Sequence, residues 1–318
     1  MTNGDVYNED LISVIMSIYN EKMEWLKASI ESILNQTYSK IEFIIVLDNP
    51  DNTMIKRVVS DYANRDERII VVENDKNIGL TNSLNKALEY CKGEYIARMD
   101  ADDISDNNRL EKQLLYLKKY NYDLIGSKIR SIDESGNVIQ KSSNHPVSNN
   151  IINSILKYDN CIPHPTWFVK REVYTDLNGY RNLHTCEDYD FLLRCSQKYR
   201  IGNCNDVTLT YRLNSISISR SNALKQFLSA KYLQKNYKNI DLINQSEIDK
   251  YVNKRTTQNK VENFDKTQLY FKKALVYKEE GEFFKMVLNL ILALKTSKYF
   301  FERCKNMLFI RTIRLVKR

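Results

Sequence analysis

Residues 95–103 read YIARMDADD, an apolar run that ends in three carboxylates within four residues. Like charges crowded at the end of a buried strand repel each other, and a cation bound between them relieves that repulsion. Carboxylate oxygens are hard ligands, so Asp100, Asp102 and Asp103 predict a Mg²⁺ or Mn²⁺ site at which a phosphate group shares the coordination sphere. A solvated acidic turn is the other interpretation of so short a motif. The surrounding sequence favours the metal site.

Short apolar runs alternate with helical patterns before this segment. Strands are predicted over 11–18, 41–47, 68–72 and 95–99, with helices over 25–36, 54–62 and 80–91. The alternation predicts an α/β fold with a doubly wound, Rossmann-like, mostly parallel sheet. Ligands of such sheets bind at the carboxyl ends of the strands. Tyr19, Asp48 and the acidic cluster all follow predicted strands, so three polar groups converge on one edge.

The segments after the cluster are less regular. A helix around Leu114 is followed by a hairpin over 124–132 and 138–139, and a strand is predicted over 166–169 after the Pro-flanked His164. A helix begins at Glu187-Asp188, where acidic residues also suit a helix N-terminus electrostatically. The last strand of this part is predicted over 207–213.

Composition excludes several classes of protein. Of 318 residues 42% are hydrophobic and 28% are charged, which is ordinary for a globular protein. No stretch holds the ~18 uninterrupted apolar residues of a membrane span, and residues 1–10 are unlike a signal peptide. The six Cys show no CxxC spacing, so free thiols are expected, without a zinc site or a disulfide framework. These features predict a cytoplasmic protein.

Charge divides the chain into two parts. Residues 222–318 hold 21 Lys and Arg against 9 Asp and Glu, so the net charge of +8 comes from a basic tail behind a mildly acidic first part. We therefore predict a catalytic domain over 1–221 and a basic helical region over 222–318. A helical hairpin is expected over 268–280 and 282–295, with Gly281 between the helices.

The last segment, 303–318, carries six basic residues, no acid and seven large apolar ones. A basic amphipathic end of this kind can lie on an anionic membrane surface, which would make the protein peripheral on the inner face of the membrane. Packing on the rest of the protein, with a solvated basic face, is the alternative.

Several segments together resemble glycosyltransferase family 2, whose members have the GT-A fold. The resemblance covers residues 11–219 and rests on the order and spacing of SVIMSIYN (13–20), SILNQTY (32–38), NIGL (77–80), GEYIARMDADD (93–103) and Glu187-Asp188. It implies transfer of a sugar from a nucleotide donor, usually a UDP-sugar, to an acceptor hydroxyl with inversion at the anomeric carbon.

The resemblance assigns the donor site. Tyr19 corresponds to the aromatic residue that packs on the donor base, with Ser17 nearby, and Asp48 to the carboxylate that accepts a hydrogen bond from the base. The family usually has Asp-Asp-Gly-Ser after its second strand, whereas this chain has Leu47-Asp48-Asn49-Pro50, so only the first carboxylate position is kept.

In the acidic cluster the resemblance makes Asp102 the direct ligand of Mn²⁺ or Mg²⁺. Asp100 and Asp103 would contact the ribose, the sugar or metal-bound water. The ion neutralises charge on the departing diphosphate. Arg98 would add to that neutralisation, or else serve a purely structural role beside three carboxylates.

Asp188 corresponds to the catalytic base, which removes the proton of the acceptor hydroxyl. Glu187 would orient this base or bind the acceptor. His164 and Arg212 are candidates for acceptor or diphosphate contacts from loops, with a loop-shaping role as the alternative for His164. The family commonly has His two residues after Arg212, where this chain has Asn214.

These assignments predict an inverting, metal-dependent glycosyltransferase of surface polysaccharide or glycoconjugate assembly, acting on a saccharide or lipid-linked saccharide acceptor. The alternative is an inactive nucleotide-sugar-binding or scaffold protein that acts through its helical tail. A sugar nucleotidyltransferase would need a Gly-rich basic loop where the chain has Tyr19-Asn20-Glu21. The basic tail lacks nucleic-acid motifs, so no nucleic-acid partner is expected. A homo-oligomer is compatible with the sequence.

Overall fold

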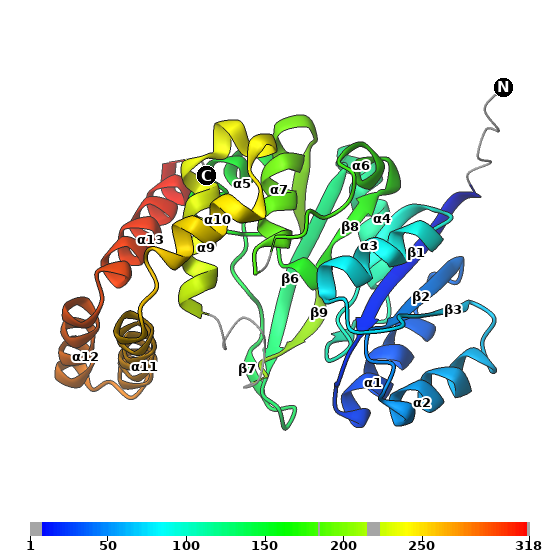
Figure 1. The fold of residues 1–318 in the computed structure, drawn as a ribbon, viewed down its shortest axis with the longest axis horizontal. Helices are drawn as coiled ribbons and strands as arrows, with labels where there is room; N and C mark the ends of the chain where they lie inside the picture. Colours follow the sequence, from blue (N-terminus) through cyan, green and yellow to red (C-terminus); the bar gives the residue numbers. More distant parts are fainter. Residues whose placement is uncertain (1–7, 184, 215–222, 317–318) are drawn as a thin grey trace. The chain divides into compact units, whose positions relative to one another are not determined.

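The computed structural model describes residues 8–183, 185–214 and 223–316 (Figure 1). Its strands are β1 Asn8–Ile18, β2 Ile41–Leu47, β3 Ile69–Glu73, β4 Gly93–Arg98, β5 Ile104–Ser105, β6 Leu124–Ile132, β7 Val138–Gln140, β8 Phe168–Lys170 and β9 Ile201–Arg212. Its helices are α1 Met23–Leu34, α2 Thr53–Ala63, α3 Leu80–Tyr90, α4 Arg109–Tyr120, α5 Asn149–Ile155, α6 Arg171–Asp176, α7 Glu187–Lys198, α9 Ala223–Lys235, α10 Gln245–Asn253, α11 Gln258–Glu279, α12 Phe283–Thr296 and α13 Lys298–Val316, with 3₁₀ turns at His164–Thr166 and Tyr237–Leu242.

The described chain divides into two compact units. The first holds β1 to β9 and their helices, and the second holds α9 to α13 together with residues 157–159. The boundary that the sequence predicts at residue 222 lies outside the described residues. The α/β class and the helical C-terminal region are confirmed.

A single mixed sheet forms the first unit. In the described residues its strand order is β3-β2-β1-β4-β8-β6-β9-β5, with β7 paired to β6. The four strands on which the parallel prediction rested, β1 to β4, are indeed parallel to one another. Beyond β4 the sheet is mixed, because β8, β5 and β7 pair antiparallel and only β6 and β9 are parallel.

Short antiparallel strands explain why the prediction of a mostly parallel sheet holds only for the first half. β5 has two residues and β8 three, so neither carries a periodic pattern that the sequence could display. The strand predicted over 166–169 begins at Phe168, because residues 164–166 form the 3₁₀ turn. The hairpin of β6 and β7 is confirmed.

Helices cover both faces of the sheet, as a doubly wound fold requires. Alternate residues of β1 and β2 share a buried cluster with the inner faces of α1, α2 and α4. Helix α3 contacts β1 and β2, and α6 contacts β4 and β8. β2 is buried along its whole length, so its run IEFIIVL needs no polar face. Burial on both faces therefore selects the β-branched runs seen in the sequence.

The order β2-β1-β4 places a topological switch point at the carboxyl ends of β1 and β4. The chain moves outward from β1 to β2 and β3, and then returns to the other side of β1 to form β4. Connections leave the two central strands in opposite directions at this point, which opens a crevice for a ligand. Tyr19 follows β1 and the acidic cluster follows β4, so both lie at this edge.

In the second unit, α11 and α12 form a helical hairpin (Figure 1). Gly281 lies between them with a φ of +76°, which glycine adopts without the steric cost that a side chain brings. The predicted hairpin is confirmed, and α11 begins ten residues before the predicted start.

Helix α7 is fixed by a buried carboxylate. Asp190 is fully buried and forms ion pairs with Arg181 and Arg194. Arg194 also donates to the carbonyl oxygens of Leu177 and Gly179 at 2.7 and 2.9 Å. These bonds connect the first turn of α7 to the preceding loop, so they set the position of Glu187 and Asp188 at the start of the helix.

Replacement of Asp190 by Ala should lower the free energy of unfolding by about 3–5 kcal/mol, because two guanidinium groups lose a buried partner. The control is Asp176→Ala, which removes an exposed pair with Lys198 and should cost less than about 1 kcal/mol. Urea unfolding followed by circular dichroism measures both. Equal losses for the two variants would contradict the structural role of Asp190.

Candidate functional site

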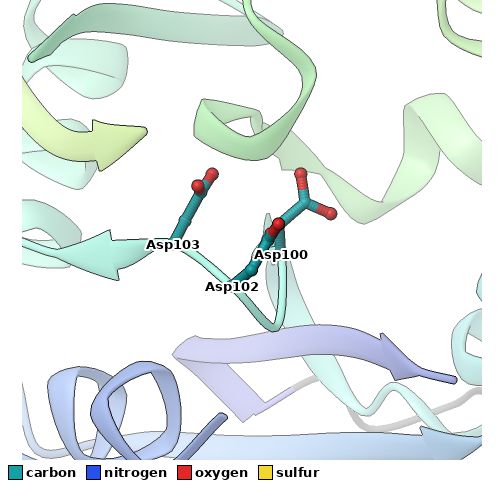
Figure 2. A group of neighbouring side chains, drawn as sticks. All are labelled: Asp100, Asp102 and Asp103. Carbon is teal, nitrogen blue, oxygen red and sulfur yellow. The ribbon is translucent and has the colours of Figure 1, made fainter. Parts of the chain in front are cut away.

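The acidic cluster lies on the turn between β4 and β5 (Figure 2). One carboxylate oxygen from each of Asp100, Asp102 and Asp103 lies within 4.8 Å of the other two. Asp103 is fully buried, and its Oδ2 has no hydrogen-bond partner among the described residues. A buried oxygen without a donor is costly. Three converging carboxylates, one of which has a buried oxygen without a partner among the described residues, fit a divalent cation.

Two buried arginines lie beneath this turn. Arg98 forms an ion pair with Asp100 and keeps its Nε without a partner among the described residues. Arg109 donates from Nη2 to the carbonyl oxygen of Arg98 at 2.7 Å and from Nε to Gln113 at 2.9 Å. Burial lowers the pKa of Arg109 to about 9, while Asp103 opposes that shift. Both side chains are therefore cationic at neutral pH and offset the negative charge above them.

Arg212, the last residue of β9, holds the other side of the turn. Its backbone N–H donates to Asp103 Oδ1 at 2.9 Å, and its Nε donates to the carbonyl oxygen of Asp102 at 3.0 Å. The guanidinium also lies over the ring of Trp25, 4.9 Å from the centroid. Arg212 thus fixes the backbone of the acidic turn.

Burial and repulsion between carboxylates raise the pKa values of Asp102 and Asp103. The pKa of Asp102 is raised to about 6, first by burial and then by the charge of Asp100. Burial raises the pKa of Asp103 well above its ordinary range, and Asp100 and Asp102 add to the shift. The protein without a cation therefore resists full ionisation of this cluster, as expected for a site built to hold positive charge.

Asp48 is buried at the end of β2 and already has three donors. Its Oδ1 accepts from Asn74 Nδ2 and from the Ile78 N–H, both at 2.8 Å, and its Oδ2 accepts from the Gly79 N–H at 2.9 Å. The carboxylate therefore holds the loop before α3 in place. A base contact, which the resemblance implies, would use the remaining lone pair of Oδ2.

Tyr19 and Ser17 lie at the end of β1. Tyr19 is 45% exposed, so its ring is accessible for stacking, and Ser17 is partly buried. Glu21, which was not among the predicted site residues, accepts a hydrogen bond from the Tyr19 N–H at 2.9 Å. Burial raises the pKa of Glu21 to about 7, and the charges of Asp102 and Asp100 also contribute. Glu21 is thus a fourth carboxylate in the field of the cluster.

Glu187 and Asp188 form the first turn of α7, as predicted. Asp188 Oδ2 accepts from Asn160 Nδ2 at 2.9 Å, and Oδ1 accepts from the Tyr189 N–H at 2.6 Å. Burial raises the pKa of both groups, that of Glu187 to about 7, and the charge of Arg98 opposes the rise. The same arginine thus acts on the acidic cluster and on the start of α7.

His164 lies inside an aromatic cluster. Its Nε2 is 2.8 Å from the hydroxyl of Tyr180, and its ring packs edge-on against Trp167 at a centroid distance of 4.5 Å. Burial lowers the pKa of His164 well below its ordinary value, and Arg98 adds to that shift. The imidazole is therefore neutral near pH 7 and supports the loop before β8.

Three residues of this region were not predicted from the sequence to belong to the site: Glu21, Arg109 and Asn160. Glu21 stands two residues after Tyr19 in the same loop, which is a usable signal. Arg109 appears in the sequence as an ordinary charge at a helix start, and Asn160 as an ordinary loop residue. Their roles depend on contacts with residues far away in the chain, which a local pattern does not reveal.

Comparison with known proteins identifies relatives over this same part of the chain. The model of glycosyl transferase family 2 matches residues 13–196. The chain is 38% identical over 229 residues to the O-antigen biosynthesis glycosyltransferase WbnJ of Escherichia coli, which covers 70% of this chain and 87% of that protein. It is 37% identical over 232 residues to an uncharacterized glycosyltransferase of Methanocaldococcus jannaschii, covering 72% and 80%.

Among solved structures, that of S. aureus TarS 1-349 in complex with UDP-GlcNAc is similar, with a TM-score of 0.60. The match covers 95% of this chain and 90% of that chain at 18% identity, so it bears on the fold. Together with the family match it confirms the predicted GT-A type of α/β fold followed by a helical region.

Within residues 8–183, 185–214 and 223–316, no helix has the length and apolar character needed to cross a bilayer.

The free energy of unfolding of the metal-free protein should fall as pH rises from about 4.5 through 7. Glu21 and Glu187 have pKa values of about 7 in the folded state. The folded state therefore binds more protons than the unfolded chain in this window, and each extra proton gives a slope of about 1.4 kcal/mol per pH unit.

Urea unfolding in EDTA between pH 5 and 8 measures this slope. The double variant Glu21→Gln and Glu187→Gln should flatten it, whereas Glu24→Gln, at an exposed position of α1, should leave it unchanged. A stability that rises across the window in the unaltered protein would contradict the raised pKa values.

Proposed function

The chain belongs to glycosyl transferase family 2 and is a glycosyltransferase, and we propose that it inverts the anomeric carbon and depends on a divalent metal ion. In this proposal a sugar moves from a UDP-sugar to the hydroxyl of a saccharide or lipid-linked saccharide. One observation carries it: the converging carboxylates of Asp100, Asp102 and Asp103, with a buried oxygen that has no partner among the described residues.

The residues of the acidic turn fit Mn²⁺ or Mg²⁺. Asp102 is the proposed direct ligand, because Asp100 is engaged by Arg98 and Asp103 accepts from the Arg212 backbone. When bound, the ion supplies Lewis acidity to the leaving diphosphate. Asp100 and Asp103 orient the turn and contact the ribose, the sugar or metal-bound water, and Arg98 holds Asp100 in place through their ion pair.

For the donor we propose a nucleotide at the switch point of the sheet. The exposed ring of Tyr19 offers a stacking surface for the base, with Ser17 beside it. Asp48 holds the loop at Ile78-Gly79 and offers its remaining lone pair to a base N–H. UDP is the proposed nucleotide, because a protein of similar fold, S. aureus TarS, is described as a complex with UDP-GlcNAc.

The proton chemistry is assigned to Asp188. It is held at the first turn of α7 by Asn160 and by the Tyr189 N–H, so its carboxylate has a fixed direction. A single displacement needs one base and no enzyme nucleophile. Asp188 removes the acceptor proton as the oxygen attacks the anomeric carbon, and Glu187 orients this base or binds the acceptor.

Arg212 and His164 receive positioning roles in this scheme. Arg212 fixes the backbone of the acidic turn and brings a guanidinium near the diphosphate. His164 is neutral and packed among aromatic rings, so it shapes the acceptor loop. We propose that residues 1–221 form the catalytic domain. The proposed setting is assembly of a surface polysaccharide or glycoconjugate, since two relatives, WbnJ and the amylovoran biosynthesis glycosyltransferase AmsE of Erwinia amylovora, are named for such assembly.

Mn²⁺ together with the correct donor should raise the melting temperature by about 5–10 °C at ligand concentrations near 100 Kd. A thermal-shift screen of UDP-, GDP- and dTDP-sugars with Mn²⁺ or EDTA measures this. Asp102→Asn should lose the Mn²⁺-dependent part, and Asp61→Asn, an exposed carboxylate of α2, should keep it. If no sugar nucleotide shifts the melting temperature, or if Asp102→Asn behaves like the unaltered protein, the donor and metal proposal fails.

Asp188→Asn should lower kcat by about 10²–10⁴-fold, because general-base catalysis contributes a factor of that size. Donor binding should change little, since the acidic turn and Tyr19 are untouched. Steady-state release of UDP with acceptor measures kcat, and calorimetry measures donor affinity. Asp176→Asn, an exposed carboxylate of α6, is the matched control.

An Asp188→Asn variant that folds, binds donor and keeps full transfer would remove Asp188 from the mechanism. A protein that binds donor through Asp102 but transfers no sugar to any acceptor, even unaltered, would instead be the inactive nucleotide-sugar-binding protein.

A further inference from the structure

Helix α12 is apolar over most of its surface and leaves many large apolar side chains exposed. The residues it buries are Asn289 and Ala293. Other apolar residues of the helix, Met286, Val287, Leu290 and Leu292, are partly buried. The exposed set is Phe283, Phe284, Leu288, Ile291 and Leu294, with Phe284 at 88%. A surface helix of a globular protein normally keeps polar residues on its exposed side, so the exposed side of α12 is suited to contact with an apolar phase.

These five side chains, which we call the α12 face, form one continuous surface. At about 100° of rotation per residue they fall within an arc of about 140° on the helix. Lys295 lies inside this arc, between Phe284 and Leu288. Lys285 lies about 60° beyond its edge and pairs with Glu282. Helix α12 carries no acidic residue of its own. Large apolar groups beside a lysine occur on helices that lie in a membrane interface.

The neighbouring helix α13 carries exposed basic charge. Arg303, Lys305 and Arg311 of α13 are exposed, and Glu302, the acid of that helix, pairs with Lys231. Residues 222–318 carry 21 basic against 9 acidic side chains, a net charge of about +12. Anionic lipid headgroups attract such a surface by about 1 kcal/mol for each Lys or Arg close to it.

We propose that the α12 face docks on an anionic lipid bilayer and inserts its phenylalanine and leucine side chains among the lipid headgroups. A second copy of the chain is a poorer occupant, because two surfaces of the same strong positive charge repel each other. The inference extends the expectation from the sequence. The predicted membrane element was segment 303–318, and the proposal adds the α12 face to it.

Helix α13 adds a smaller apolar stripe. Phe301, Leu308 and Leu315 are exposed and stand seven residues apart, so they share one side of the helix. This stripe interrupts the basic residues of α13, as an interfacial helix does. It supports a bilayer as the partner, and it is separate from the catalytic groups proposed above.

Co-sedimentation of the full chain with lipid vesicles tests the proposal. Vesicles of phosphatidylcholine with about 30 mol% phosphatidylglycerol should retain the protein, and pure phosphatidylcholine should retain at least about tenfold less. Raising NaCl to about 0.5 M should reduce binding to the anionic vesicles, since it shortens the Debye length. Equal binding to both vesicle types, or to neither, would overturn the proposal.

Variants locate the contact. Leu288→Asp with Ile291→Asp should lower the ratio of bound to free protein by about tenfold or more, because each large apolar side chain kept in water forfeits a factor of that order. Met54→Asp with Leu115→Asp makes the same chemical change at exposed apolar positions of α2 and α4 and should leave binding unchanged. Circular dichroism checks that both variants fold.

Light scattering tests whether a second copy of the chain, and not a bilayer, covers the α12 face. If the unaltered chain is a dimer that Leu288→Asp with Ile291→Asp converts to a monomer, and vesicle binding is absent, the α12 face is a contact between copies and the membrane proposal is wrong. Release of UDP from the donor is measured in parallel and should be equal in all variants. Failure of the membrane proposal thus leaves the proposed catalytic function untouched, and the reverse also holds.

Discussion

The site depends on Arg98, the last residue of β4. Its buried guanidinium pairs with Asp100, and its backbone N–H donates to the Trp167 carbonyl oxygen at 2.9 Å. Burial disfavours its charge, but the neighbouring carboxylates raise its pKa above the ordinary value. A buried cation needs a partner, so an acidic residue after β4 is required by the fold as well as by the chemistry. Asp100 thereby has a structural role beside Arg98, in addition to the ligand contact proposed for it.

The sheet supplies the second constraint, because it decides which side chains can meet Arg98. Return of the chain to the far side of β1 places the end of β4 beside the loop that carries Tyr19 and Glu21. β9 then delivers Arg212 to the same turn. Residues from sequence positions about 190 apart therefore share one electrostatic field, although no segment contains more than a part of the site.

Local patterns sufficed for the first half of the fold. The run IEFIIVL is strand β2 as predicted, and the acidic cluster, Asp48 and Glu187-Asp188 all lie at element ends, where they were expected. The short antiparallel strand β5 was not predicted, because its identity comes from pairing with a distant strand and not from periodicity, and β8 was predicted two residues too early, over 166–169. Asp48 shows how little of a site residue's environment a local sequence pattern predicts. The sequence indicated a polar group at a strand end, but only the folded chain shows three donors on it.

The charges of the site support the proposal that a cation accompanies a bound diphosphate. Glu21, Asp102, Asp103, Glu187 and Asp188 lie close to one another, and the guanidiniums of Arg98 and Arg212 act on several of them. Burial raises the pKa values of these five carboxyl groups, and repulsion between neighbouring carboxylates adds to the rise at Glu21, Asp102, Asp103 and Glu187. A diphosphate would add further negative charge. In the proposed function, positive charge enters together with the donor, and the converging oxygens of the acidic turn would hold it.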